Sequence, residues 1–157
     1  MILKPQDILV LLKLTVLDNA HWTYSSLASE LFMSPSEVHA GIRRATQSRL
    51  YSQPDQRPIF ANFEEFLIHG IKYSFPAVSG TRTRGIVTSY GASPLKDVLV
   101  QEDDLPPVWP YNQGKNQGIA LSPLYKSVPQ AATKDNKLYE LLTIDRKSTR
   151  LNSSHYS

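Results

Sequence analysis

Residues 25–45, SSLASELFMSPSEVHAGIRRA, contain two amphipathic segments that are separated by only a few polar residues. Ser34 is a favourable N-cap, Pro35 suits the first position of a helix, and Glu37 stands three residues after the cap. This combination is a capping box, which favours the start of a new helix over the continuation of the previous one. The sequence therefore predicts two helices joined by a tight turn.

The second of these helices, expected over residues 36–50, has two different faces at about 100° per residue. The inward face contains Val38, Gly41, Ile42 and Ala45. The outward face contains Ser36, Ala40, Arg43 and Gln47, and it is flanked by His39 and Arg44. A stripe that is polar, cationic and small at one position suits a helix that approaches base edges and phosphates in a DNA major groove. An ordinary solvated helix surface is the alternative interpretation.

The elements around this pair follow from the same local signals. Pro5 favours the start of a helix that is apolar nearly all round through Leu17, so this helix is expected either in the core or at a contact with a second subunit. Thr23 is the expected N-cap of the next helix. One face of that helix is predicted to carry Leu27, Ala28, Leu31 and Phe32.

Beyond the basic helix, Leu50-Tyr51 and Ile59-Phe60 are predicted to form two short strands. The Pro/Asp-containing loop between them carries Arg57. Asn62 is the expected N-cap of a further short helix, with Gly70 just past its end.

This order of elements, with the motif LASELFMSPSEVHAGIRRA followed by LY, resembles the winged helix-turn-helix of bacterial transcriptional regulators, and most of all the MarR type. The resemblance covers about residues 4–70 and implies an α+β fold that binds double-stranded DNA. It places a set of side chains against the DNA: Ser34, Ser36, His39, Ala40, Arg43 and Gln47. We expect Arg43 and Gln47 to contact bases, whereas Arg44, Arg49 and the wing residue Arg57 would contact phosphates.

The second half, residues 71–144, departs from that family. It is rich in Gly and Pro, which predicts short strands and turns rather than the long dimerisation helices of MarR-type proteins. A brief helix is expected to open at Ser93-Pro94-Leu95. A final helix is expected in AATKDNKLYELL, residues 131–142, with Leu138, Leu141 and Leu142 facing inward. The predicted domains are thus residues 1–70, 71–144 and a tail, 145–157.

SGTRTRG, residues 79–85, is predicted to be a Gly-bounded loop. Its Arg82 and Arg84 are candidate contacts for a phosphate on DNA or on a small ligand, and solvated arginines in a hairpin loop are the alternative. The acidic run at residues 102–104 is expected in an exposed loop, and Trp109 is expected to be a packing anchor.

The formal net charge of the chain is too small to indicate DNA binding by itself. The 157 residues carry a formal net charge of +3 and no cysteine, so thiolate metal sites and disulfides are excluded and a cytoplasmic setting is the simple expectation. However, DRKSTRLNSSH at residues 145–155 resembles the translation of a sequencing-library adapter. That tail contains three basic residues and one acidic residue, so the formal net charge without it is +1.

Catalysis has little support in the sequence. His21, His39 and His69 show no metal-ligand spacing, and no Gly-x-Ser-x-Gly nucleophile motif is present. The sequence therefore predicts no metal, no cofactor and no enzymatic activity. An enzyme with its site in the second half stays as a minor alternative.

The leading expectation is a sequence-specific transcriptional regulator that binds double-stranded DNA as a homodimer, to which the apolar first helix contributes. The alternative is a protein-interaction module, such as an antitoxin-like winged helix whose second half caps a protein partner. No segment is apolar enough to predict a membrane span.

Overall fold

The computed structural model describes residues 2–88 and 105–143 and has the expected α+β composition. The first half contains α1 (Pro5–Leu17), α2 (Tyr24–Leu31), α3 (Pro35–Gln47), β1 (Tyr51–Ser52) and β2 (Arg57–Pro58). A continuous helical run follows, made of α4 (Phe60–Glu65), the π-helical turn η1 (Phe66–Gly70) and α5 (Ile71–Ser74). The second half contains β3 (Ser79–Val87), β4 (Pro107–Pro110), β5 (Asn116–Leu121), α7 (Val128–Lys134) and a helical segment at 136–143.

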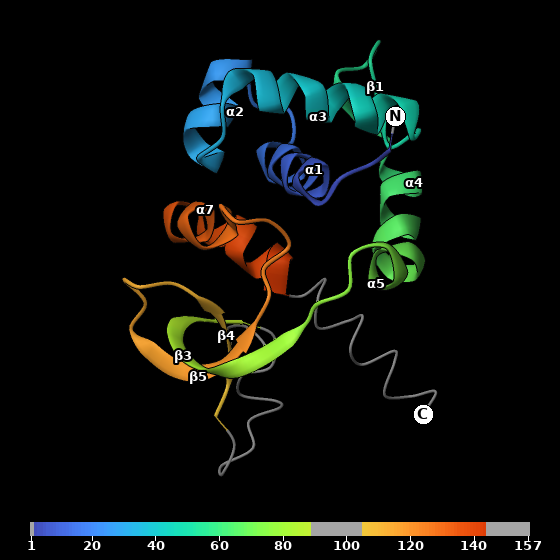
Figure 1. Cartoon of the computed structure of the whole chain (residues 1–157). Coiled ribbons are helices and arrows are strands. Elements are labelled where there is room, and N and C mark those ends of the chain that lie inside the picture. The colour runs from blue at the N-terminus through green and yellow to red at the C-terminus, as the bar shows by residue number, and fades with distance from the viewer. Residues whose placement is uncertain (1, 89–104, 144–157) are drawn as a thin grey trace.

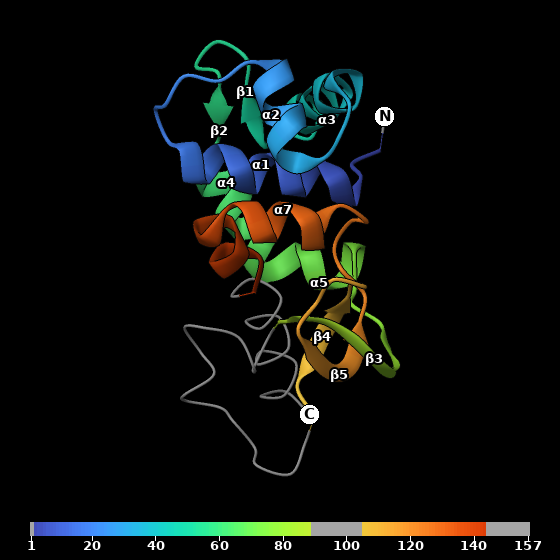
Figure 2. The same cartoon turned by 90° about the vertical axis from the view of Figure 1, so that its left-hand side faces the viewer.

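The helices form layers on either side of α1. Figures 1 and 2 show α2 and α3 on one side of α1, α7 on the opposite side, and the strands β3, β4 and β5 at the far end of the molecule. Residues 7–14 of α1 are all buried. The core that covers them also includes Val128 and Ala131 of α7 and Leu138 and Leu142 of the last helical segment. The α1 helix is therefore buried in the chain's own core, which corrects the expectation that it contributes to a contact between subunits.

Local capping signals set the start of the first three helices. Pro5 is the first residue of α1, as predicted. Thr23 Oγ1 accepts a hydrogen bond from the N–H of Ser26 (3.0 Å), and Ser34 Oγ accepts one from the N–H of Glu37 (3.1 Å). Both predicted N-caps are thus confirmed. The expectation for Phe32 is wrong: it ends α2 in the left-handed conformation (φ 56°), and the residue is 46% exposed.

The strands and the helix after α3 are shifted from their predicted positions. The pair β1–β2 aligns Tyr51 with Pro58, so Arg57 lies in a strand rather than in a loop. The backbone of Ile59 precedes α4, whereas Asn62 lies inside that helix and is not its cap. Gly70 also lies inside the helical run, which continues to residue 74, so no break falls at the predicted domain boundary.

The three strands of the second half form a small closed barrel. Strand β3 is antiparallel to both β4 and β5, and β4 is parallel to β5. The prediction of short strands is confirmed, but SGTRTRG belongs to β3 and is not a loop. Gly85 is required where β3 meets β4, since a Cβ atom there would collide with the carbonyl oxygen of Trp109. Trp109 is buried and its ring packs edge-on against Tyr139, which confirms its predicted packing role.

The single final helix predicted at residues 131–142 is instead two helical segments. The extended backbone of Asp135 separates α7 from residues 136–143. Leu138 and Leu142 are buried as expected, whereas Leu141 is only partly buried. The brief helix predicted at residues 93–95, the acidic run at 102–104 and the tail lie outside the described residues.

Candidate functional site

The two faces of α3 have the burial that the sequence predicts. Val38, Gly41, Ile42 and Ala45 are all buried. On the other side, Ser36, His39, Arg43 and Gln47 are exposed and Ala40 is partly exposed. These five residues are called the α3 outer face below. Within α3 the only carboxylate is that of Glu37, which lies in the first turn.

Arg44 does not flank the α3 outer face, and its predicted outward placement is wrong. Its side chain is 12% exposed and turns toward α1, where Asp7 is fully buried. Nε and Nη2 of Arg44 donate to the two carboxylate oxygens of Asp7, each at 2.8 Å. Such a two-point contact fixes both side chains and raises the pKa of Arg44. Arg44 therefore fastens α3 to α1 and does not supply a free cation for a phosphate.

Asp7 also determines how closely the two helices approach. It accepts a third hydrogen bond from the N–H of Lys4 (2.9 Å), which caps α1. A Cβ atom on Gly41 would lie 2.9 Å from Asp7 Oδ1, so glycine provides the space for the carboxylate at the crossing of α1 and α3. The position of the α3 outer face thus depends on a buried polar contact on the opposite side of the helix.

Ser34 is used within the helix cap. Its hydroxyl lies 3.1 Å from Glu37 Oε1 and 3.2 Å from the hydroxyl of Ser36, in addition to the backbone bond that it accepts. Ser34 is partly buried, whereas Ser36 is exposed. Of the two serines predicted to face DNA, Ser36 is the one with a free approach from solvent.

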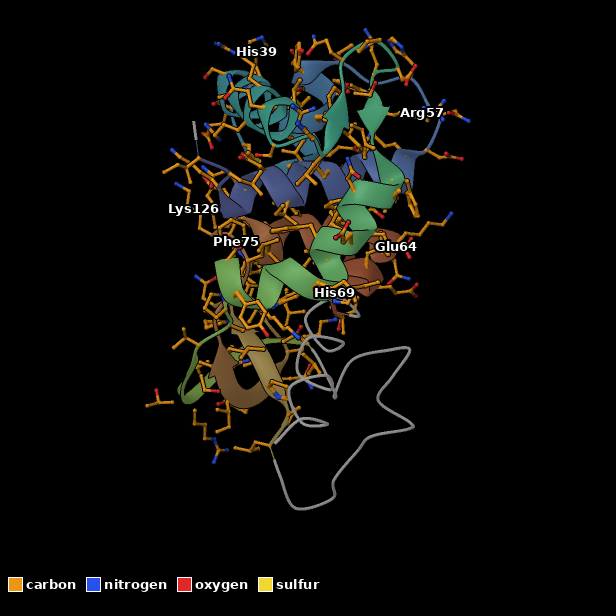
Figure 3. All side chains as sticks on the ribbon, turned by 90° about the vertical axis from the view of Figure 1, so that its right-hand side faces the viewer. His39, Arg57, Glu64, His69, Phe75 and Lys126 are labelled. Carbon is orange, nitrogen blue, oxygen red and sulfur yellow. The ribbon has the colours of Figure 1, made fainter. Side chains whose placement is uncertain are left out.

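Arg49 and Arg57 extend the exposed cationic surface beyond α3. Arg49 has a positive φ of 63° in the turn after α3, and its carbonyl accepts a hydrogen bond from Nδ2 of Asn62 (2.8 Å). Arg57 in β2 donates from Nη2 to the side-chain oxygen of Asn19 (3.2 Å). Figure 3 shows His39 and Arg57 at the same end of the molecule, away from the three-stranded sheet.

Two aromatic residues next to the α3 outer face were missed by the sequence analysis. The ring of Tyr24 lies edge-on to His39 with centroids 5.2 Å apart, and Trp22 contacts Tyr24 in the same manner at 5.7 Å. Tyr24 is 37% exposed. The signal was the HWTY stretch beside the Thr23 cap, because a residue at the start of α2 can reach α3 across the turn.

Arg82 and Arg84 belong to a different surface. Both are exposed on β3, and Nη1 of Arg84 donates to the carbonyl oxygen of Gly114 (3.3 Å). Thr83, Arg84, Pro110, Tyr111 and Asn112 line a shallow, open groove there. Since β3 lies at the opposite end of the molecule from α3, these arginines do not join the α3 outer face (Figure 1).

No metal-ligand cluster is found in the part of the chain that the structure describes. His39 and His69 lie on separate parts of the molecule (Figure 3). Within residues 2–88 and 105–143, no helix combines the length and the apolar character that crossing a bilayer requires.

Comparison with known proteins gives no matching family model, no similar curated protein and no similar solved structure. Functional inference therefore rests on the residues described above.

Proposed function

We propose that this protein is a sequence-specific, double-stranded DNA-binding transcriptional regulator in which about residues 4–70 form a winged helix-turn-helix. The observation that carries the proposal is the α3 outer face. It combines an exposed cation, three further exposed hydrogen-bonding side chains and a small central residue on a helix whose opposite face is buried. A helix of this kind can enter a major groove without disturbing the core.

Within this proposal, the exposed residues divide into those that contact bases and those that contact phosphates. Arg43 and Gln47 lie one turn apart and suit contacts with base edges, arginine to guanine and glutamine to adenine. Arg49 and Arg57 stand beyond the end of α3 and suit phosphate contacts, which position a protein on the duplex without selecting its sequence. Arg44 is left out of the interface because Asp7 occupies its guanidinium group.

The small formal net charge favours specific over general binding. Phosphate contacts supply most non-specific affinity. In the part of the chain that the structure describes, the exposed arginines of α3 and of the segment through β2 are Arg43, Arg49 and Arg57. The single carboxylate of α3, Glu37, is occupied by Ser34 and Tyr125, so it does not oppose the approach of a phosphate from the outer face.

A homodimer would let two copies of α3 contact successive major grooves. Because α1 is buried, we place the contact on the helical run of residues 60–74, where Phe60 (61% exposed), Ile68 (40%) and Tyr73 (78%) are accessible. The same exposed apolar side chains favour the second candidate function, a module that binds a protein partner in the manner of an antitoxin.

The test is selection of bound sequences from a random pool of duplex DNA, followed by titration of the selected duplex at several salt concentrations. The full chain is compared with a variant in which Arg146, Lys147 and Arg150 are changed to Gln, so that the tail contributes no cations. We expect Arg43→Ala with Gln47→Ala to lower affinity for the selected duplex by about 10- to 100-fold. We expect Arg57→Gln to weaken all duplexes equally and to reduce the salt slope by about one.

Two results would contradict the proposal. One is the absence of any enriched sequence with the unaltered chain at low salt. The other is equal affinity of the Arg43→Ala, Gln47→Ala variant for the selected duplex. Self-association that Tyr73→Ser abolishes would support the homodimer contact. If a chain that forms this homodimer still binds no DNA, the protein-interaction function is favoured.

A further inference from the structure

The second half of the chain contacts the turn between α2 and α3. Tyr125 lies in the segment between β5 and α7, and its hydroxyl donates to Glu37 Oε2 at 3.1 Å, across 88 residues of sequence. Lys134, at the end of α7, places its ammonium group 5.5 Å from the centre of the Phe32 ring. Phe32 ends α2 and Glu37 lies in the first turn of α3, so the turn is contacted on both sides.

The two oxygens of Glu37 divide between these partners. Oε1 lies 3.1 Å from the Ser34 hydroxyl and 3.4 Å from the Ser34 N–H, which completes the capping box. Oε2 accepts the hydrogen bond from Tyr125. A single carboxylate therefore joins the start of α3 to the second half of the chain.

The charges suit this arrangement at neutral pH. Burial would raise the pKa of Glu37, but the hydrogen bonds from Tyr125 and Ser34, with the charge of Lys126 nearby, lower it below its usual value. Burial and the bond to Glu37 raise the pKa of Tyr125. The donor therefore keeps its proton and the acceptor keeps its charge. Figure 3 places Lys126 on the flank of the molecule below His39.

A third contact fastens the same part of the chain to α1 and α2. Nζ of Lys13 lies 2.6 Å from Asp135 and 3.2 Å from Glu30, and only 4% of the Lys13 side chain is exposed. Asp135 also accepts hydrogen bonds from the N–H groups of Lys137 and Leu138, so it is held in place itself. The segment from Tyr125 to Asp135 is thus attached at three points and does not rest on one surface contact.

We infer that Tyr125 and Lys134 are positioning residues for α3, through which the second half of the chain sets DNA affinity. Tyr125 acts on the start of α3 through Glu37, and Lys134 acts on the end of α2 through Phe32. This inference rests on the proposed function, because it assigns the consequence of the contacts to the DNA surface on the far side of α3.

The first variant changes only a hydroxyl group. Tyr125→Phe removes the donor to Glu37 and keeps the ring. Tyr111→Phe is the matched control, since the Tyr111 hydroxyl donates to Gln113 (3.3 Å) in the turn between β4 and β5, far from α3. Hydrogen exchange of a peptide covering residues 34–42 is measured without DNA, and affinity is measured for the duplex that the unaltered full chain selects. Lys134→Met is the second variant, because it keeps the side-chain length and removes the charge.

Loss of a hydrogen bond of ordinary net strength predicts about threefold to tenfold faster exchange at the start of α3 in Tyr125→Phe, with a comparable loss of affinity for the selected duplex. Glu37→Gln retains an oxygen acceptor and is expected to fall between the wild type and Tyr125→Phe. Affinity for random duplex is expected to stay unchanged, since the phosphate-contacting arginines are untouched. Tyr111→Phe is expected to match the wild type in each measurement.

Unchanged exchange in both Tyr125→Phe and Lys134→Met would overturn the inference and leave the proposed function standing. Faster exchange with unaltered affinity for the selected duplex would also overturn it, because the contacts would then be structural only. If the unaltered chain binds no duplex, the proposed function fails and the inference fails with it. The exchange data would still show whether the contacts order α3.

Discussion

The inner and outer faces of α3 differ in how much of the chain constrains them. The inner face contacts α1 through Gly41 and the Asp7–Arg44 ion pair, and its apolar residues lie in the shared core. The outer face contacts solvent and, at His39, the ring of Tyr24. The comparison indicates that substitutions on the inner face should lower the free energy of unfolding much more than substitutions on the outer face.

The largest effect on stability is expected from Asp7→Ala. This change leaves the Arg44 guanidinium without its partner in a site that is nearly closed to water, which should lower the free energy of unfolding by about 3–5 kcal/mol. Urea unfolding followed by circular dichroism measures the change. The double variant with Arg44→Ala should lose less than the sum of the two single changes, because no unpaired charge remains. A loss below about 1 kcal/mol in Asp7→Ala would mean that the ion pair does not hold the helices together.

A direct test of the two faces pairs Ile42→Ala with Gln47→Ala. Ile42 is 3% exposed, so its truncation leaves a cavity and should cost about 2–4 kcal/mol. Gln47 is exposed, and its truncation should change stability by less than about 0.5 kcal/mol. Unfolding of both variants at the same urea concentration would contradict the difference between the two faces of α3.

Loss of the Ser34 capping box should lower the free energy of unfolding by a smaller amount. Ser34→Ala removes the acceptor for the N–H of Glu37 and should cost about 1 kcal/mol, as N-cap replacements usually do. Thermal melting measures it, and Ser34→Asp, which restores an N-cap acceptor, is the control expected to retain most of the stability. Equal losses in both variants would show that the hydroxyl acts through its contacts with the Glu37 and Ser36 side chains rather than as the cap acceptor.

The smallest expected effect is the change in the free energy of unfolding as the pH is lowered into the acid range. The pKa values of Glu37 and Asp135 are both lower in the folded chain than their usual values of 4.5 and 3.8. For Asp135, burial opposes this shift, and the hydrogen bonds from Lys13 and Leu138 outweigh it. Folding is therefore favoured above these usual values, and the contribution is lost as the pH falls below them.

Urea unfolding at pH 6 and at pH 3 measures this loss. Glu37→Gln should reduce the difference between the two pH values, because one of the two carboxylates no longer titrates. A difference that is unchanged in Glu37→Gln would assign the acid sensitivity to other carboxylates.

Features set by neighbouring residues were predictable from the sequence. Pro5, the Thr23 cap and the Ser34 capping box act within four residues, and the burial of Val38, Gly41, Ile42 and Ala45 follows from helical periodicity. The exposed members of the α3 outer face were predicted for the same reason.

The errors arose where distant residues decide the structure. Arg44 has a place on a helical wheel that allows an outward orientation, but Asp7, 37 residues away, turns it inward. Gly70 has the local signature of a helix end, yet the helical run passes through it and Ile71 is buried in the core. Arg82 lies in a strand because β5 pairs with it, a partner that local turn signals cannot indicate.

The contact of Lys13 with Asp135 has a consequence for synthesis of the chain. The two residues are separated by 122 positions, so at about 5–20 residues per second roughly 6–24 s pass between the addition of one and of the other. During that interval α1, α2 and α3 can assemble on the ribosome, but the side of α1 that later meets α7 has no cover. Folding of this core is therefore complete only after α7 and residues 136–143 have left the ribosome. A ribosome that stalls after β5 would hold a nascent chain with an uncovered apolar surface.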